Sequence, residues 1–82
     1  MSAKIKEKEQ VKLPNRLSVK LLEKRVSMNI SQVEMAKKVG LSYPVYAGIE
    51  RGTYTASLKL LTKISNYLDI SLEETFKLYF EK

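Results

Sequence analysis

The chain has 82 residues and contains neither cysteine nor histidine. This length predicts one domain, and the two missing residue types exclude disulfides, Cys and Ser-His nucleophilic dyads and the commonest zinc ligand sets. Lys and Arg number 15 against 9 acidic residues, a net charge of +6 that either favours polyanionic partners or serves solubility alone. The sequence shows no membrane-spanning apolar run and no secretory signal, so we expect a cytoplasmic protein.

The beginning of the chain differs in composition from the rest. Residues 1–14 contain four lysines and two glutamates but few apolar side chains. This composition predicts a flexible basic arm ahead of a folded domain at 15–82. The arm is either a solvated tail or a segment that touches the backbone of DNA.

A helix is predicted to begin directly after the arm. Leu17 and Leu21 recur at helical spacing, and Leu22 and Val26 extend the same apolar stripe before the helix closes near residues 28–30. Asn15 precedes the stripe and is a suitable N-cap, because its side-chain oxygen can accept from a free backbone N–H of the first turn.

Two short helices with a tight connection follow. Residues 31–34 (Ser-Gln-Val-Glu) form a capping box that opens a helix over 32–39, and Gly40 fits the left-handed position that ends it. A second helix over about 43–51 begins almost at once and ends at Gly52. Helices joined by so short a glycine turn must cross steeply, which is the geometry of a helix-turn-helix.

Two more helices are predicted in the last third of the chain. Ser57 caps one of them, whose apolar side chains share a face: Leu58, Leu61, Ile64 and Leu68. A second capping box, residues 71–74 (Ser-Leu-Glu-Glu), opens the other, with Leu72, Phe76, Tyr79 and Phe80 on one side. Because no strand alternation or internal repeat is present, we expect an all-α fold of five helices.

Three motifs carry a resemblance to a known family. They are residues 30–36 (Ile-Ser-Gln-Val-Glu-Met-Ala), 40–42 (Gly-Leu-Ser) and 49–52 (Ile-Glu-Arg-Gly). In order and spacing they resemble the Cro/C1-type (XRE) helix-turn-helix family, and residues 57–74 are similar to the last two helices of its domain. The resemblance covers about 16–76. It implies a five-helix, lambda repressor-like DNA-binding domain whose second and third helices form the helix-turn-helix.

The same resemblance implies a function. We expect a sequence-specific transcriptional regulator, a repressor that binds an operator in double-stranded DNA as a homodimer, with its third helix in the major groove. No catalytic residue, cofactor, metal or separate small-molecule ligand domain is expected. The alternative for this fold is an antitoxin or anti-repressor-like interaction module. An enzyme would have to work without His, Cys or a phosphate-binding glycine loop.

The resemblance also implies roles for side chains outside the third helix. Arg25 and Glu50 match positions that form a structural ion pair, which would orient the reading helix more than stabilise it. The alternative is two separately solvated side chains. Gln32 matches a glutamine that touches a backbone phosphate, and an added capping role is compatible with this. Ser31, beside it, joins the predicted DNA contacts.

The residues predicted to read bases lie on the helix at 43–51 and at its cap. They are Ser42, Tyr43, Pro44, Val45, Ala47 and Gly48, while Tyr46 and Ile49 should face inward. Strong readers place Gln, Asn, Arg or Lys here, and this helix has none before Arg51. Specificity is therefore either modest or dependent on DNA shape and half-site spacing, unless this surface faces a protein.

Two further features belong to this region. Arg51, Thr53 and Tyr54 follow the reading positions and are predicted to contact phosphate, which fixes register rather than sequence. Gly48 inside a helix costs about 1 kcal/mol relative to Ala. A close approach of the DNA backbone or of another helix would explain this cost.

The end of the chain suggests a dimer interface. Residues 76–80 contain four apolar side chains, more than one helical face can bury: Phe76, Leu78, Tyr79 and Phe80. We expect the surplus, with Leu78 and Phe80 the first choices, to form the dimer surface. The alternative is additional core.

Overall fold

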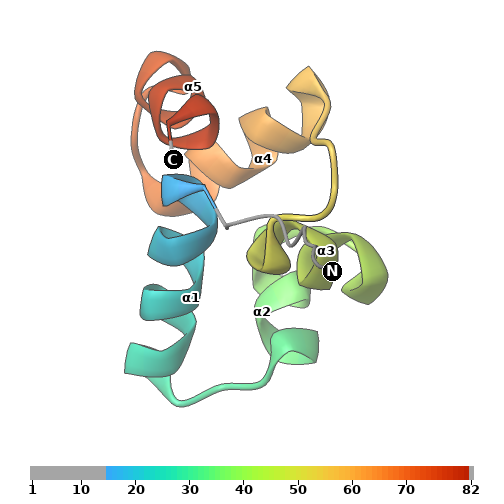
Figure 1. Ribbon diagram of the computed structural model, residues 1–82. Coiled ribbons are helices and arrows are strands. Elements are labelled where there is room, and N and C mark those ends of the chain that lie inside the picture. Colours follow the sequence, from blue (N-terminus) through green and yellow to red (C-terminus); the bar gives the residue numbers. More distant parts are fainter. Residues whose placement is uncertain (1–14, 82) are drawn as a thin grey trace, which may run out of the picture.

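The computed structural model describes residues 15–81, so the predicted arm at 1–14 lies outside the described residues. The described part contains five helices and no strand: α1 (Arg16–Met28), α2 (Gln32–Val39), α3 (Tyr43–Arg51), α4 (Leu58–Leu68) and α5 (Leu72–Phe80). The all-α prediction is confirmed. Figure 1 shows α4 and α5 at one end of the molecule, α2 and α3 at the other, and α1 along the side of both.

Most helix boundaries follow from local capping, as predicted. Asn15 accepts the backbone N–H of Ser18, and Ser31 forms the complete capping box with Glu34. Gly40 ends α2 in the left-handed conformation, with φ at 89°, where a side chain would be strained. The second predicted box is only half formed: the Ser71 hydroxyl accepts from the Glu74 backbone, and only this bond joins the two residues.

The core joins all five helices. Its buried side chains are Leu17, Leu21, Met35, Ala36, Val39, Tyr46, Ile49, Leu61, Ile64 and Leu78. The helix α3 packs on α1 and α2, and α5 packs on α1 and α4. The arrangement of α2 and α3 is therefore supported by α1, which contacts both α3 and α5.

The predicted apolar stripe of α1 is wrong in its second half. Leu17 and Leu21 are fully buried, but Leu22 and Val26 are exposed, together with Val19. With about 3.6 residues per helical turn, positions 19, 22 and 26 share a face opposite the one that carries Leu17 and Leu21. Apolar spacing predicted the helix correctly and assigned two of its side chains to the wrong face.

Candidate DNA interface

The exposed surface of α3 lies at its two ends, in the N-terminal turn and at Arg51. Ser42 and Pro44 are exposed, Tyr43 is 47% exposed, and Val45 is half-buried. Ser42 occupies the N-cap position but makes no capping hydrogen bond with its side chain, and Pro44 has no N–H to satisfy. This turn therefore presents the hydroxyls of Ser42 and Tyr43, the small apolar surface of Pro44 and the backbone N–H groups that begin the helix.

The predicted outward positions of Ala47 and Gly48 are wrong. Five consecutive residues of α3, from Tyr46 to Glu50, are buried. The helices α1 and α2 cover one side of this segment, and the loop after α3 covers another. Base contacts by Ala47 or Gly48 are excluded in this conformation, because neither residue reaches the surface.

The loop after α3 explains the glycine at position 48. A Cβ on Gly48 would lie 2.9 Å from the Cβ of Tyr54, closer than side-chain carbons approach. The Gly48 carbonyl oxygen also accepts the backbone N–H groups of Thr53 at 2.9 Å and Tyr54 at 3.2 Å. The close approach is therefore made by the chain's own loop rather than by DNA or another helix. It leaves Arg51, Thr53 and Tyr54 exposed beside the end of α3.

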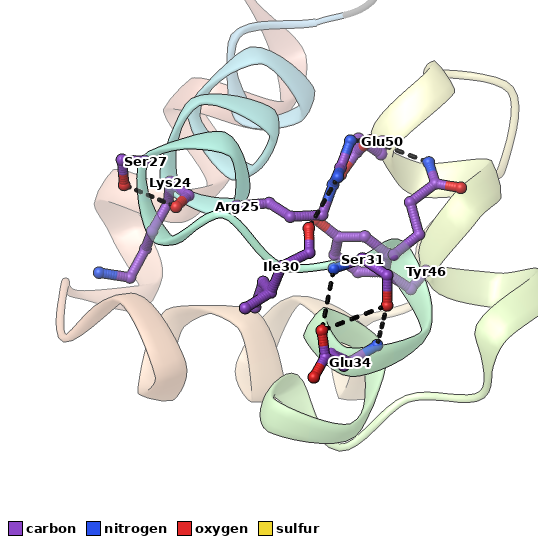
Figure 2. Close-up of polar contacts among 9 residues, drawn as sticks. Lys24, Arg25, Ser27, Ile30, Ser31, Glu34, Tyr46 and Glu50 are labelled. Atoms are coloured by element: carbon purple, nitrogen blue, oxygen red, sulfur yellow. Dashed lines mark hydrogen bonds and ion pairs between the residues drawn. The ribbon is translucent and has the colours of Figure 1, made fainter.

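The predicted ion pair between Arg25 and Glu50 is present and forms the centre of a network (Figure 2). Arg25 donates from Nε to Glu50 Oε2 at 2.9 Å and from Nη2 to Oε1 at 3.0 Å, a bidentate arrangement. Its Nη1 donates to the carbonyl oxygen of Ile30 at 3.0 Å. The Tyr46 hydroxyl donates to Glu50 Oε2 at 2.6 Å. One carboxylate thus ties the end of α3 to α1 and to the connection before α2.

Protonation of this network follows from its geometry. Burial alone would raise the pKa of Glu50, but hydrogen bonds from Arg25, Tyr46 and Gln32, with the Arg25 charge, hold it below its ordinary value. Burial, followed by the hydrogen bond to Glu50, strongly raises the pKa of Tyr46. The hydrogen bond to Glu50 raises the pKa of Arg25. An ionised carboxylate beside a neutral phenol and a guanidinium is therefore the stable state.

Gln32 joins the same network, which sequence reasoning missed. Its Nε2 donates to Glu50 Oε1 at 2.9 Å, so the start of α2 is fixed to the end of α3. The capping box of α2 is completed by Ser31 and Glu34, which leaves the predicted second capping role of Gln32 unfilled. A primary amide has a second N–H and a carbonyl oxygen, so this bond orients the group without exhausting it.

The predicted dimer surface at the end of the chain is partly wrong. Leu78, one of the two first choices, is 9% exposed and belongs to the core, because α5 directs it against α1. Tyr79 is half-buried, and its hydroxyl accepts the backbone N–H of Ala56 at 2.8 Å. Phe80 is 72% exposed, and Phe76 is exposed beside it with an edge-to-face ring contact. Only the two phenylalanines remain as surplus apolar surface on α5.

Within residues 15–81, no group of three or more acidic, Cys or His side chains is placed to hold a metal. No described helix is long and apolar enough to span a membrane. The geometry of the described part, with α3 crossing α2 and its N-terminal turn exposed, defines a helix-turn-helix DNA-binding domain.

Comparison with known proteins agrees with this class. A helix-turn-helix family model matches residues 21–74. The chain is 39% identical over 57 residues to an HTH-type transcriptional regulator of Methanocaldococcus jannaschii, over 70% of this chain and 86% of that protein. The chain belongs to the Cro/C1-type helix-turn-helix family and is a DNA-binding transcriptional regulator.

Solved structures support the same fold. The restriction-modification controller protein C.AhdI from Aeromonas hydrophila is similar, with a TM-score of 0.59 and 29% identity, over 84% of this chain and 100% of that one. The clp gene regulator ClgR from C. glutamicum has a TM-score of 0.57 over 83% of this chain and 88% of that one. At 22% identity, ClgR shows likeness of fold alone.

Proposed function

We propose that the protein is a cytoplasmic, non-enzymatic repressor that binds an operator as a homodimer and blocks polymerase by occupying it. The observation that supports this most is the exposed N-terminal turn of α3, with Tyr43 and Pro44 at the surface ahead of a buried segment from Tyr46 to Glu50. A steeply crossed helix pair can insert such a turn into the major groove while α2 rests on the DNA backbone.

Base readout is assigned to four residues, Ser42, Tyr43, Pro44 and Val45. The hydroxyls of Ser42 and Tyr43 each supply single hydrogen bonds, and the two apolar side chains can contact thymine methyl groups. None of the four makes the bidentate contacts that separate bases most strongly. Sequence discrimination per half-site is therefore modest, and DNA shape and half-site spacing supply the remainder.

Phosphate contacts are assigned to residues on both sides of the reading turn. Gln32 lies at the N-terminus of α2, where the helix dipole attracts an anion, and its amide is already oriented by Glu50. Arg51, Thr53 and Tyr54 are exposed at the other side of α3. Together with Ser31, these contacts fix the register of the domain on the duplex.

The dimer is assigned to the outer surface of α5. Phe76 and Phe80 are exposed there, with ring centroids 6.4 Å apart. A single domain of this size buries too little surface to select one genomic site, whereas two half-sites about one helical turn apart double the contacts.

The test uses a duplex that the wild-type protein selects from a randomised pool, compared with a mixed-sequence duplex of equal length. We expect Tyr43→Ala to weaken binding of the selected duplex by about three- to tenfold and the mixed duplex much less, since a single hydrogen bond contributes about 0.5–1.5 kcal/mol. Val26→Ala, on the outer face of α1, is the control and should change neither. Equal losses on both duplexes would contradict base readout by Tyr43.

A second candidate function has one observation in its favour. The exposed residues Val19, Leu22 and Val26 form an apolar stripe on α1, which suits an antitoxin or anti-repressor-like interaction module. This role predicts a chain that selects no duplex even at low salt, where phosphate contacts are strongest. The same selection experiment therefore separates the two candidates.

A further inference from the structure

The hydroxyl of Tyr79, on α5, contacts the loop at 53–56. It accepts the backbone N–H of Ala56 at 2.8 Å and donates to the carbonyl oxygen of Tyr54 at 3.4 Å. This loop follows α3 directly and carries Thr53 and Tyr54, two of the proposed phosphate contacts. A side chain of the last helix is thus bonded to the segment that faces the duplex.

The loop is held at both of its ends. At its start, the carbonyl oxygen of Gly48 accepts the N–H groups of Thr53 and Tyr54. At its end, the Tyr79 hydroxyl bridges the backbone on either side of Thr55. Thr53, Tyr54 and Thr55 are all exposed, so apart from the contact of Tyr54 with Gly48 this segment is held by hydrogen bonds.

The hydrogen bonds of Tyr79 connect the loop at 53–56 to a helix that packs on other elements than α3 does. The helix α3 packs on α1 and α2, whereas α5 packs on α1 and α4. The ring of Tyr79 is packed against the core and makes an edge-to-face contact with the ring of Phe80, with centroids 5.0 Å apart. The ring is therefore fixed by the body of the domain, and its hydroxyl transmits that fixed position to the loop.

We infer that Tyr79 is a positioning residue for DNA binding, which holds the loop at 53–56 so that Thr53 and Tyr54 face phosphate. The inference rests on the proposed function, because it needs a bound duplex. Packing does not require the hydroxyl, since a phenylalanine ring fills the same space. Removal of the Tyr79 hydroxyl leaves the Ala56 N–H without its acceptor and frees the end of the loop.

The experiment compares two Tyr→Phe variants that each remove one hydroxyl. Tyr79→Phe is the test and Tyr67→Phe is the matched control, because among residues 15–81 the Tyr67 hydroxyl hydrogen-bonds only to the sulfur of Met28, at 3.8 Å. The probe is a duplex of about 30 bp selected by the wild-type protein, which accommodates two half-sites. We expect Tyr79→Phe to weaken binding about tenfold and Tyr67→Phe less than about twofold, at an unchanged dimer dissociation constant.

Two further measurements separate positioning from a general effect on folding. Amide hydrogen exchange at Ala56 should be faster in Tyr79→Phe, while exchange in α4 and α1 stays unchanged. In a double-mutant cycle, Tyr54→Phe should cost less affinity in the Tyr79→Phe background than in the wild type, because the Tyr54 hydroxyl is already misplaced.

Strictly additive losses in this cycle would overturn the inference, and so would equal binding by the two single variants. A global rise in amide exchange across α1 and α4 would also overturn it, because Tyr79 would then act through stability. A wild-type protein that selects no duplex would overturn the proposed function and this inference with it. The two failures are therefore distinguishable from the behaviour of the wild type alone.

Discussion

Replacement of Glu50 by glutamine tests the network that connects α1, α2 and α3. The variant keeps the shape of the side chain and removes its charge. In the wild-type protein the Glu50 carboxylate accepts hydrogen bonds from Arg25, Tyr46 and Gln32. An amide has one acceptor oxygen, and its NH₂ group would face donors that also need an acceptor. The variant therefore leaves at least one donor unsatisfied in a buried position.

The expected loss of stability can be worked from the burial of the pair. The side chain of Glu50 is 5% exposed and that of Arg25 is 19% exposed. Removing one partner of a buried ion pair costs about 3–5 kcal/mol, and we take the lower end, about 3 kcal/mol, because Arg25 keeps the carbonyl oxygen of Ile30 as an acceptor. At about 4–8 °C per kcal/mol for a domain of this size, the Tm should fall by about 12–24 °C.

The chain offers a matched control in its other described ion pair. Arg16 Nη1 lies 3.1 Å from Glu81 Oε1, and the two side chains are 63% and 52% exposed. Glu81→Gln should therefore cost less than about 1 kcal/mol. The assay is thermal and urea unfolding followed by circular dichroism. Equal shifts of Tm in Glu50→Gln and Glu81→Gln would refute the reasoning. A double variant Arg25→Met/Glu50→Gln should be more stable than Glu50→Gln alone, because the stranded charge is gone.

Three other perturbations test the charges, the loop contact and the packing of α5. The free energy of unfolding should depend on pH at both extremes. The contribution of Glu50 to it is fully present above the ordinary pKa of 4.5 and is lost as pH falls through the lowered pKa of the folded state. The contribution of Tyr46 is fully present below the ordinary pKa of 10.0 and is lost as pH rises above it. Urea unfolding across pH measures both limbs, and an acid limb as steep in Glu50→Gln as in the wild type would contradict the assignment. Gly48→Ala gains about 1 kcal/mol of helix propensity but forces Tyr54 outward at about 1–3 kcal/mol, so urea unfolding should show a net loss of about 1 kcal/mol, and a stabilised variant would show that the loop yields freely. Leu78→Ala should lower the free energy of unfolding by about 2–5 kcal/mol and leave the dissociation constant of the dimer unchanged. Phe80→Ser should weaken the dimer, measured by sedimentation, with little loss of stability. The reverse pattern would place Leu78 at the interface.

Several side-chain contacts of the candidate interface lay beyond sequence reasoning. The bond from Gln32 to Glu50 joins two helices, and no local signal marks it. Tyr46 and Glu50 lie four residues apart on α3, a spacing that permits their bond without indicating it. Arg25 and Glu50 were paired only through the family resemblance, since 25 residues separate them along the chain. Tyr79 gave no sign of its bond to the loop, because an aromatic residue in an apolar run predicts burial or an interface and not a hydrogen bond.

The faces of the helices were also decided by tertiary contacts. Gly48 is buried where the loop after α3 packs against it, Ala47 lies in the same buried segment, and Leu78 is buried where α5 packs on α1. Leu22 and Val26 have the apolar spacing of a core stripe and nevertheless lie outside it. Periodicity states which side chains share a face, but several faces of a short helix can carry apolar residues, and only the neighbouring elements select one.

The sequence by itself determined the number, order and bounds of the helices, because caps and left-handed glycines act within a few residues of one another. The bounds predicted for α2 and α3 agree with those observed, Gln32–Val39 and Tyr43–Arg51, and both helices end at the predicted glycines. Only the tertiary structure decided which part of α3 meets solvent, which aromatic residues of α5 remain outside, and how one carboxylate holds three helices together. These outcomes depend on contacts between segments distant in sequence, whose geometry is set by the packing of the whole domain.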